Sequence, residues 1–169
     1  ASFFYADSLN TQMTTLQHEL THQILAEFSA GRAPSWLAEG IAVYLESVPL
    51  DRDRRQTRRD SENYRVRAYA EGIQAGLNEH DFSRIMTFRT EEDWNSGEIA
   101  KNYRGAGAVV HFLMNMDEGR YRADFLDMLR DAYYGGDRSP ESYFDLSEEG
   151  LTFLMNRFYK SANTAETIT

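Results

Sequence analysis

The sequence contains no cysteine, so it can form no disulfide bond and offers no thiolate ligand. Any transition-metal site must therefore be built from histidine, carboxylate and water. Basic charge is also scarce, with 18 lysines and arginines against 27 aspartates and glutamates and a net charge of −9. This balance argues against a general nucleic-acid binder. No apolar run approaches the roughly 20 residues that a membrane-spanning helix needs, so we expect no membrane span.

The length and composition fit one compact domain with a hydrophobic core, since 41% of the 169 residues are hydrophobic and 13% are aromatic. We place this domain at residues 1–160 and a disordered tail at residues 161–169. The first residue is Ala1 rather than Met, which leads us to expect a processed chain or the C-terminal part of a longer one. The sequence does not determine the cellular location, although an extracytoplasmic or secreted location is favoured.

Apolar residues recur at spacings of three or four along much of the chain, which is typical of helices. The first such run extends from Met13 to Phe28. Gly31 then indicates the end of this helix, and Pro34 indicates the start of a second helix that reaches about Ser47. Further helices are predicted over residues 62–75, 99–116, 121–134 and 140–159.

The remaining segments are predicted to be mostly irregular. The aromatic opening, residues 1–8, predicts a short strand, and the arginine-rich residues 48–60 predict a solvated loop. Residues 82–88 form a short apolar group within a mixed loop. The predicted fold class is mainly α, or α+β: a helical domain with at most a small sheet near its N-terminus.

Two of the four histidines lie in the stretch QHELTHQ, residues 17–23. On a helix, residues four apart share a face, so His18 and His22 can direct their ring nitrogens to one point. Glu19 lies about 100° further round the helix. It can reach a water molecule held at that point without becoming a ligand, which suits a general base. The stretch therefore predicts a zinc site on the first helix.

A catalytic zinc ion usually has three protein ligands and one open position, so a third ligand is expected downstream. The second helix, PSWLAEGIAVYLES, offers Glu39 and Glu46. These two residues are seven positions apart and lie on the same helical face. Spacing alone does not choose between them.

QHELTHQ followed by WLAEGIAVY resembles the gluzincins, zinc metallopeptidases with a HExxH helix and a glutamate ligand on a second helix. In aminopeptidase N-like members the second helix reads WLNEGFA and its glutamate binds zinc. The resemblance therefore implies Glu39 as the third ligand, and it places Glu46 behind the ligands or on the surface. NYRGAGAVVHFL resembles a helix start whose tyrosine stabilises an oxyanion, which implies that role for Tyr103. The overall pattern, over residues 14–135, is most similar to compact bacterial gluzincin-like domains.

The sequence departs from this family at two points. Thermolysin-type members have an acidic residue four positions after the third ligand, where it orients a histidine. That position is Val43 here, so the partner of the histidine must come from elsewhere. The chain also lacks the GxMEN motif with which the aminopeptidases recognise a free amine. Endopeptidase activity is therefore favoured over aminopeptidase activity.

Three residues are reserve candidates for the site. His111 lies in an apolar stretch of the helix that follows Tyr103, a position typical of a hydrogen-bonded core histidine. His80 lies in the loop NEHDF and is typical of a surface residue, although thermolysin-type gluzincins use a downstream histidine as a transition-state donor. Glu46 is the reserve ligand.

The sequence thus predicts zinc-dependent hydrolysis of peptide bonds, with one zinc ion per chain and a peptide or protein as substrate. His18, His22 and Glu39 are the predicted ligands, Glu19 is the predicted general base, and Tyr103 is the predicted oxyanion donor. One alternative is a non-catalytic domain that retains zinc for recognition or structure within a larger protein. Another is a helical interaction domain that binds no metal. The presence of Glu19 favours the enzyme, because a structural zinc site has four protein ligands and needs no base.

Overall fold

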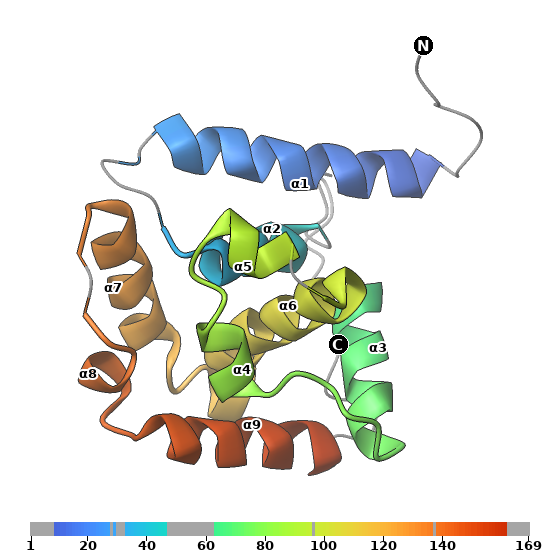
Figure 1. Cartoon of the computed structure of the whole chain (residues 1–169), viewed down its shortest axis with the longest axis vertical. Coiled ribbons are helices and arrows are strands. Elements are labelled where there is room, and N and C mark those ends of the chain that lie inside the picture. The colour runs from blue at the N-terminus through green and yellow to red at the C-terminus, as the bar shows by residue number, and fades with distance from the viewer. Residues whose placement is uncertain are drawn as a thin grey trace.

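The computed structural model describes residues 9–27, 29, 33–46, 63–95, 97–136 and 138–161, with side chains described from residue 13 onward. Every regular element within these ranges is a helix (Figure 1), which confirms the mainly α fold class. The predicted strand at residues 1–8, the predicted loop at residues 48–60 and the tail after residue 161 lie outside the described residues. None of the described helices is both long enough and apolar enough to cross a membrane.

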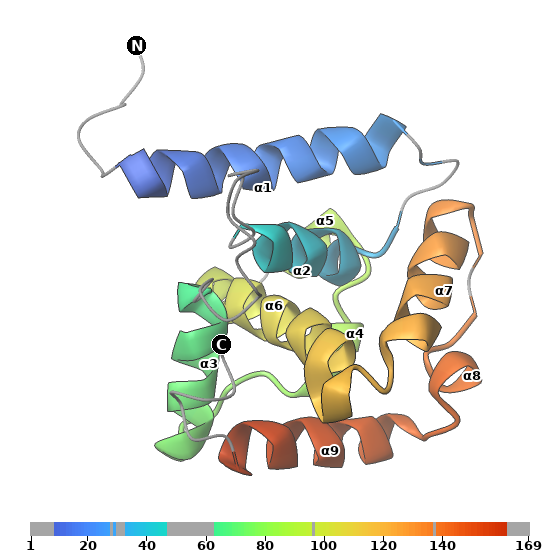
Figure 2. The same cartoon turned by 180° about the vertical axis from the view of Figure 1, so that it is seen from behind.

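The first two helices carry the two motifs that the sequence analysis singled out. α1 (Leu9–Glu27) contains QHELTHQ, and α2 (Ser35–Leu45) contains WLAEG. α1 lies along one edge of the molecule, with α2 next to it and α6 (Ile99–Asn115) on the far side of α2 (Figures 1 and 2). α2 is apolar on most of its surface, and this surface is covered because the helix contacts both α1 and α6. It also holds the WLAEG motif against the histidine helix.

α6 forms the centre of the hydrophobic core, and its residues 105–110 are buried. The other long helices, α3 (Tyr64–Gln74), α7 (Arg122–Tyr133) and α9 (Glu148–Ser161), surround it (Figure 2). Large aromatic side chains that are almost fully buried fill the space between these helices: Tyr69, Phe82, Phe88, Phe112, Phe125 and Tyr159.

Two glycines allow α2 and α6 to approach closely. A Cβ atom on Gly40 would lie 2.8 Å from the backbone oxygen of Ala106, and a Cβ atom on Gly107 would lie 2.3 Å from Cγ1 of Val43. Both distances are shorter than any normal carbon contact, so neither position has room for a side chain. The glycine of WLAEG therefore sets the distance between α2 and the core, and with it the position of the neighbouring Glu39.

Three short helices were not predicted from the sequence. α4 (Phe82–Met86) and α5 (Glu91–Asn95) occupy a region predicted as loop, and η2 (Met116–Glu118) follows α6 after a kink, with Asp117 at a φ of 45°. The backbone N–H of Thr90 donates to Oδ2 of Asp93 over 2.9 Å, and the N–H of Asp93 donates to Oγ1 of Thr90 over 3.1 Å. This reciprocal pair is a capping box at the start of α5, a local signal that the sequence analysis missed.

The single helix predicted over residues 140–159 is in fact two helices. α8 (Glu141–Phe144) ends at Asp145, whose φ of 50° lies in the left-handed region. Aspartate tolerates this conformation better than most residues, and it breaks the helical path. α9 then begins with a side-chain cap, in which the N–H of Gly150 donates to Oγ of Ser147 over 3.1 Å.

Candidate metal centre

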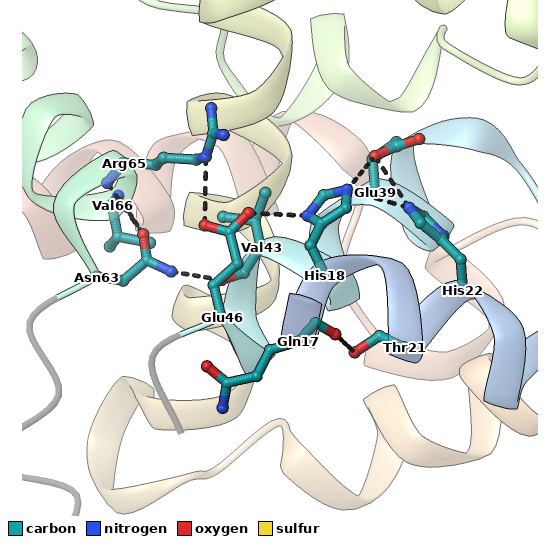
Figure 3. A network of polar contacts seen from close by, with 10 residues as sticks. All are labelled: Gln17, His18, Thr21, His22, Glu39, Val43, Glu46, Asn63, Arg65 and Val66. Carbon is teal, nitrogen blue, oxygen red and sulfur yellow. Dashed lines mark hydrogen bonds and ion pairs between the residues drawn. The ribbon is translucent and has the colours of Figure 1, made fainter. Parts of the chain in front are cut away.

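Three side chains from α1 and α2 converge on one point (Figure 3). Nε2 of His18 lies 3.1 Å from Nε2 of His22 and 3.2 Å from Oε2 of Glu39. Nε2 of His22 lies 3.4 Å from the same carboxylate oxygen. The i, i+4 spacing places both imidazoles on the face of α1 that meets α2, and α2 supplies the carboxylate.

The geometry of these three atoms fits a tetrahedral metal ion. Ligand bonds of about 2.0–2.1 Å in a tetrahedral zinc site separate the ligand atoms from one another by about 3.3 Å. The separations of 3.1, 3.2 and 3.4 Å among His18, His22 and Glu39 are close to that value. The three residues are also the one His/Asp/Glu group within the described ranges whose atoms are close enough to share an ion. Two imidazoles and one carboxylate are a donor set that suits zinc.

Glu46 lies behind the cluster and binds the other nitrogen of His18. Its Oε1 accepts a hydrogen bond from Nδ1 of His18 over 2.8 Å, and the residue is only 5% exposed. This bond places the Nδ1 proton on the Glu46 side and turns Nε2 towards His22 and Glu39. Glu46 is the residue that follows the last turn of α2, and it contacts the ring nitrogen of His18 that faces away from His22 and Glu39. It is not one of the three converging residues.

The charges in the cluster shift the acidities of two of its members. Burial disfavours a charged His18, but hydrogen bonds to Glu39 and Glu46 outweigh this effect and raise the pKa of His18 to about 9. Burial likewise disfavours a charged Glu39, yet hydrogen bonds with His18 and His22 lower the pKa of Glu39 to about 2. Without a metal ion, His18 is therefore a cation and Glu39 an anion at neutral pH. A metal cation would replace that proton.

The cluster is accessible from one side. The side chain of His18 is 10% exposed, whereas that of His22 is 30% exposed and that of Glu39 is 20% exposed. A cleft of about 950 Å³ opens beside His22. Tyr133 of α7 lines this cleft, and burial together with the charge of Glu39 raises the pKa of Tyr133 to about 12. Of the three cluster residues, His22 is the one that lines this cleft.

Tyr103 lies on the first turns of α6, close to the cluster. The centroid of its ring is 5.9 Å from that of His18, and Trp94 packs edge-on against it at 5.0 Å. Burial and then the carboxylate of Glu39 raise the pKa of Tyr103, with a smaller contribution from Glu19. The hydroxyl is thus protonated at neutral pH and can donate a hydrogen bond. Glu19 itself is exposed on α1.

The other two histidines lie outside the cluster. Nδ1 of His111 bonds to the hydroxyl of Tyr159 over 3.0 Å, which agrees with the expected hydrogen-bonded core position. His80 packs against Phe88 with ring centroids 5.8 Å apart, and burial followed by the charges of Arg84 and Lys101 lowers the pKa of His80. Neither residue joins the three converging side chains.

The sequence analysis did not predict two residues that lie next to the site. Arg65 of α3 donates from Nε to Oε2 of Glu46 over 3.3 Å, and Tyr133 lines the cleft beside His22. Both residues are distant in sequence from the motifs, and no local pattern distinguishes them from other surface arginines or packing tyrosines. Only the packing of α3 and α7 brings them to the site.

Comparison with known proteins identifies one family. The chain matches no curated protein and no solved structure. Residues 12–133 match the family described as "Protein of unknown function (DUF1570)". The matched region includes α1 and α2 with the converging side chains, α6 with Tyr103, and α7 with Tyr133. The chain therefore belongs to the DUF1570 family.

Proposed function

We propose that this protein is a zinc metallopeptidase that hydrolyses peptide bonds and holds its ion with His18, His22 and Glu39. The main support is the convergence of the three ligand atoms at separations of 3.1 to 3.4 Å. A set of three protein ligands leaves a fourth position for water, as catalytic zinc sites require, and the partial exposure of His22 and Glu39 leaves that side open. The resemblance of the two motifs to gluzincins points to the same chemistry.

A bound zinc ion supplies Lewis acidity, because it lowers the pKa of a coordinated water towards neutrality and polarises a carbonyl group. The side chains around it have separate roles. Glu46 holds Nδ1–H of His18 and so fixes the ring in its ligand orientation. Glu19 takes a proton from the attacking water and passes it to the leaving amine. The hydroxyl of Tyr103 donates to the carbonyl oxygen as negative charge develops on it.

The first experiment measures metal content by mass spectrometry in protein purified without added metal. We expect about one zinc ion per chain in the wild type and a loss of zinc in His22→Ala, because one imidazole is removed from the ligand set. A wild-type protein that takes up no zinc on titration would refute the proposal at its centre.

The second experiment tests the chemistry with a peptide library. We expect internal cleavage that is lost on chelation and restored by zinc. Glu19→Gln should abolish cleavage and keep the metal, whereas Glu27→Gln, which changes another exposed glutamate of α1, should change neither. An active Glu19→Gln protein would show that Glu19 is not the base. Bound zinc without any cleavage would favour a non-catalytic, zinc-retaining domain instead.

A further inference from the structure

Arg65 contacts two residues that lie next to the candidate metal site, Glu46 and Tyr103. Its Nε donates to Oε2 of Glu46 over 3.3 Å, while the other carboxylate oxygen of Glu46 accepts from Nδ1 of His18 over 2.8 Å. The guanidinium carbon of Arg65 also lies 4.9 Å from the centroid of the Tyr103 ring. One side chain therefore contacts the partner of a candidate ligand and the candidate oxyanion donor.

These contacts belong to a closed ring of four side chains, each of which comes from a different helix or its end. His18 of α1 bonds to Glu46 at the end of α2, Glu46 bonds to Arg65 of α3, and Arg65 lies over Tyr103 of α6. The Tyr103 ring returns to His18 with a centroid separation of 5.9 Å. Figure 3 shows the part of this ring from Arg65 through Glu46 to His18, together with the contact between His18 and Glu39.

Hydrogen bonds of Asn63 hold the first turn of α3, which contains Arg65, in place. Asn63 caps the helix, because its Oδ1 accepts from the N–H groups of Arg65 over 3.0 Å and of Val66 over 3.2 Å. The Nδ2 group of the same asparagine donates to the backbone oxygen of Val43 on α2 (Figure 3). This residue thus ties the first turn of α3 to the last turn of α2, and Arg65 starts from a fixed position beside Glu46.

The two contacts of Arg65 need different properties of its guanidinium group. Glu46 is 5% exposed, and a buried carboxylate requires hydrogen-bond donors and a nearby cation. The flat face of the same group can stack on the phenol ring of Tyr103. A lysine at this position would supply the charge but not the planar face.

We propose that Arg65 is a positioning residue that couples the orientation of His18, through Glu46, to the placement of Tyr103. This inference rests on the proposed function, since it assigns Arg65 a part in holding the same site. The side chain of Arg65 contacts Glu46 and the rings of Tyr64 and Tyr103 rather than the three candidate ligands. Its effect on metal binding passes through Glu46, and its effect on turnover also passes through Tyr103.

The test compares Arg65→Met and Arg65→Lys with Arg67→Met. Arg67 is a matched control, because it lies on the same helix with a side chain that is 42% exposed and paired with Glu71 at 4.0 Å. Zinc affinity is measured by competition with a chelator, and kcat and KM are measured on a peptide that the wild type cleaves. Circular dichroism and thermal unfolding report whether each variant is folded.

We expect Arg65→Met to weaken zinc binding by about 10-fold, at the low end of the range for residues that support metal ligands, and to lower kcat more than it changes KM. Arg65→Lys should recover most of the zinc affinity but not kcat, because it restores the charge without the planar face. A merely structural role would change the unfolding temperature and leave both the affinity of the folded protein and this split unchanged.

Double variants separate the two routes. If Arg65 acts through Glu46, Arg65→Met should weaken zinc binding little further in a Glu46→Gln background. If it acts through Tyr103, the additional loss of kcat should disappear in a Tyr103→Phe background. Full additivity in both backgrounds would overturn the inference, as would zinc affinity and kcat in Arg65→Met within twofold of those in Arg67→Met.

Failure of the inference can be distinguished from failure of the proposed function. A wild-type protein that binds no zinc refutes the function and the inference together, before any variant is compared. A wild-type protein that binds zinc, with Arg65→Met equal to Arg67→Met, refutes the inference alone. If zinc binds but no peptide is cleaved, peptidase activity and the coupling to turnover both fail, and the affinity measurements still decide whether Arg65 supports the ligand.

Discussion

Replacing Gly40 with alanine should separate α2 from the core and disturb the candidate metal site. The new Cβ would lie 2.8 Å from the backbone oxygen of Ala106 and 2.9 Å from Cγ2 of Val110. The valine methyl can turn away, but the backbone oxygen of a central helix cannot. α2 must therefore move away from α6 by about 0.5 Å to reach a normal contact distance.

The expected magnitude combines two opposing effects. Overpacking of this kind typically costs about 1–3 kcal/mol. Alanine is a better helix former than glycine by about 1 kcal/mol, which offsets part of that cost. We expect Gly40→Ala to lower the free energy of unfolding by about 0–2 kcal/mol relative to the wild type, and by about 1–3 kcal/mol relative to a glycine-to-alanine change in a helix without a close contact. Zinc affinity should fall as well, because the neighbouring Glu39 moves with α2.

Urea unfolding of the metal-free protein measures the stability effect, and chelator competition measures zinc affinity. Gly150→Ala in α9 is the matched control, since a Cβ there would meet its nearest atoms at 3.5–3.8 Å. That variant should be as stable as the wild type or slightly more stable. If Gly40→Ala matched it, the close approach of α2 and α6 would not depend on this glycine, and the reasoning would be refuted.

Four further predictions concern the site and the side chains around it. Because the pKa of His18 is about 9 in the metal-free protein, zinc must displace a proton at pH 7, and its apparent affinity should rise by about 50-fold between pH 7 and pH 9, where half of the His18 rings are already deprotonated. Calorimetry in several buffers should count the proton, and a pH-independent affinity would contradict this. The same raised pKa should stabilise the metal-free protein fully below pH 6.5, and this contribution should disappear as the pH rises through about 9, as urea unfolding with chelator present can show. Asn63→Ala should lower the free energy of unfolding by about 1–2 kcal/mol, because it removes a helix cap, while the exposed Asn78→Ala should not. His111→Ala should lose its bond to Tyr159 and lower the unfolding temperature, with the zinc content by mass spectrometry unchanged; a loss of zinc would place His111 in the metal site after all.

Local patterns account for much of the fold. The helices predicted over residues 13–28, 62–75, 99–116 and 121–134 agree with α1, α3, α6 and α7 to within a few residues, because amphipathic spacing depends on neighbours three and four positions away. The break at Asp145 was missed because it depends on a left-handed residue between two apolar stretches. Sequence spacing alone does not distinguish that arrangement from one continuous helix.

Of the candidate site residues, those on α1 follow from local sequence spacing, whereas the choice of glutamate on α2 does not. The placing of His18, Glu19 and His22 along one helix follows from sequence alone, because the i, i+4 spacing puts both imidazoles on one face in any α-helix. Sequence also predicted that a carboxylate of the second helix would meet them. Glu39 and Glu46 share a helical face, however, and the resemblance to gluzincins rather than the spacing favoured Glu39.

Only the tertiary structure decided how the two glutamates are used. The packing of α2 against α1 brings Glu39 to the Nε2 side of His18 and Glu46 to its Nδ1 side, and the close contact of Gly40 with α6 sets how near α2 lies to the core. Arg65 and Tyr133 reach the site from α3 and α7, which are far away along the chain. The sequence by itself determined which residues on α1 can bind a metal, since helical geometry is local. The packing of the other helices determined what surrounds them, because that depends on contacts between distant segments.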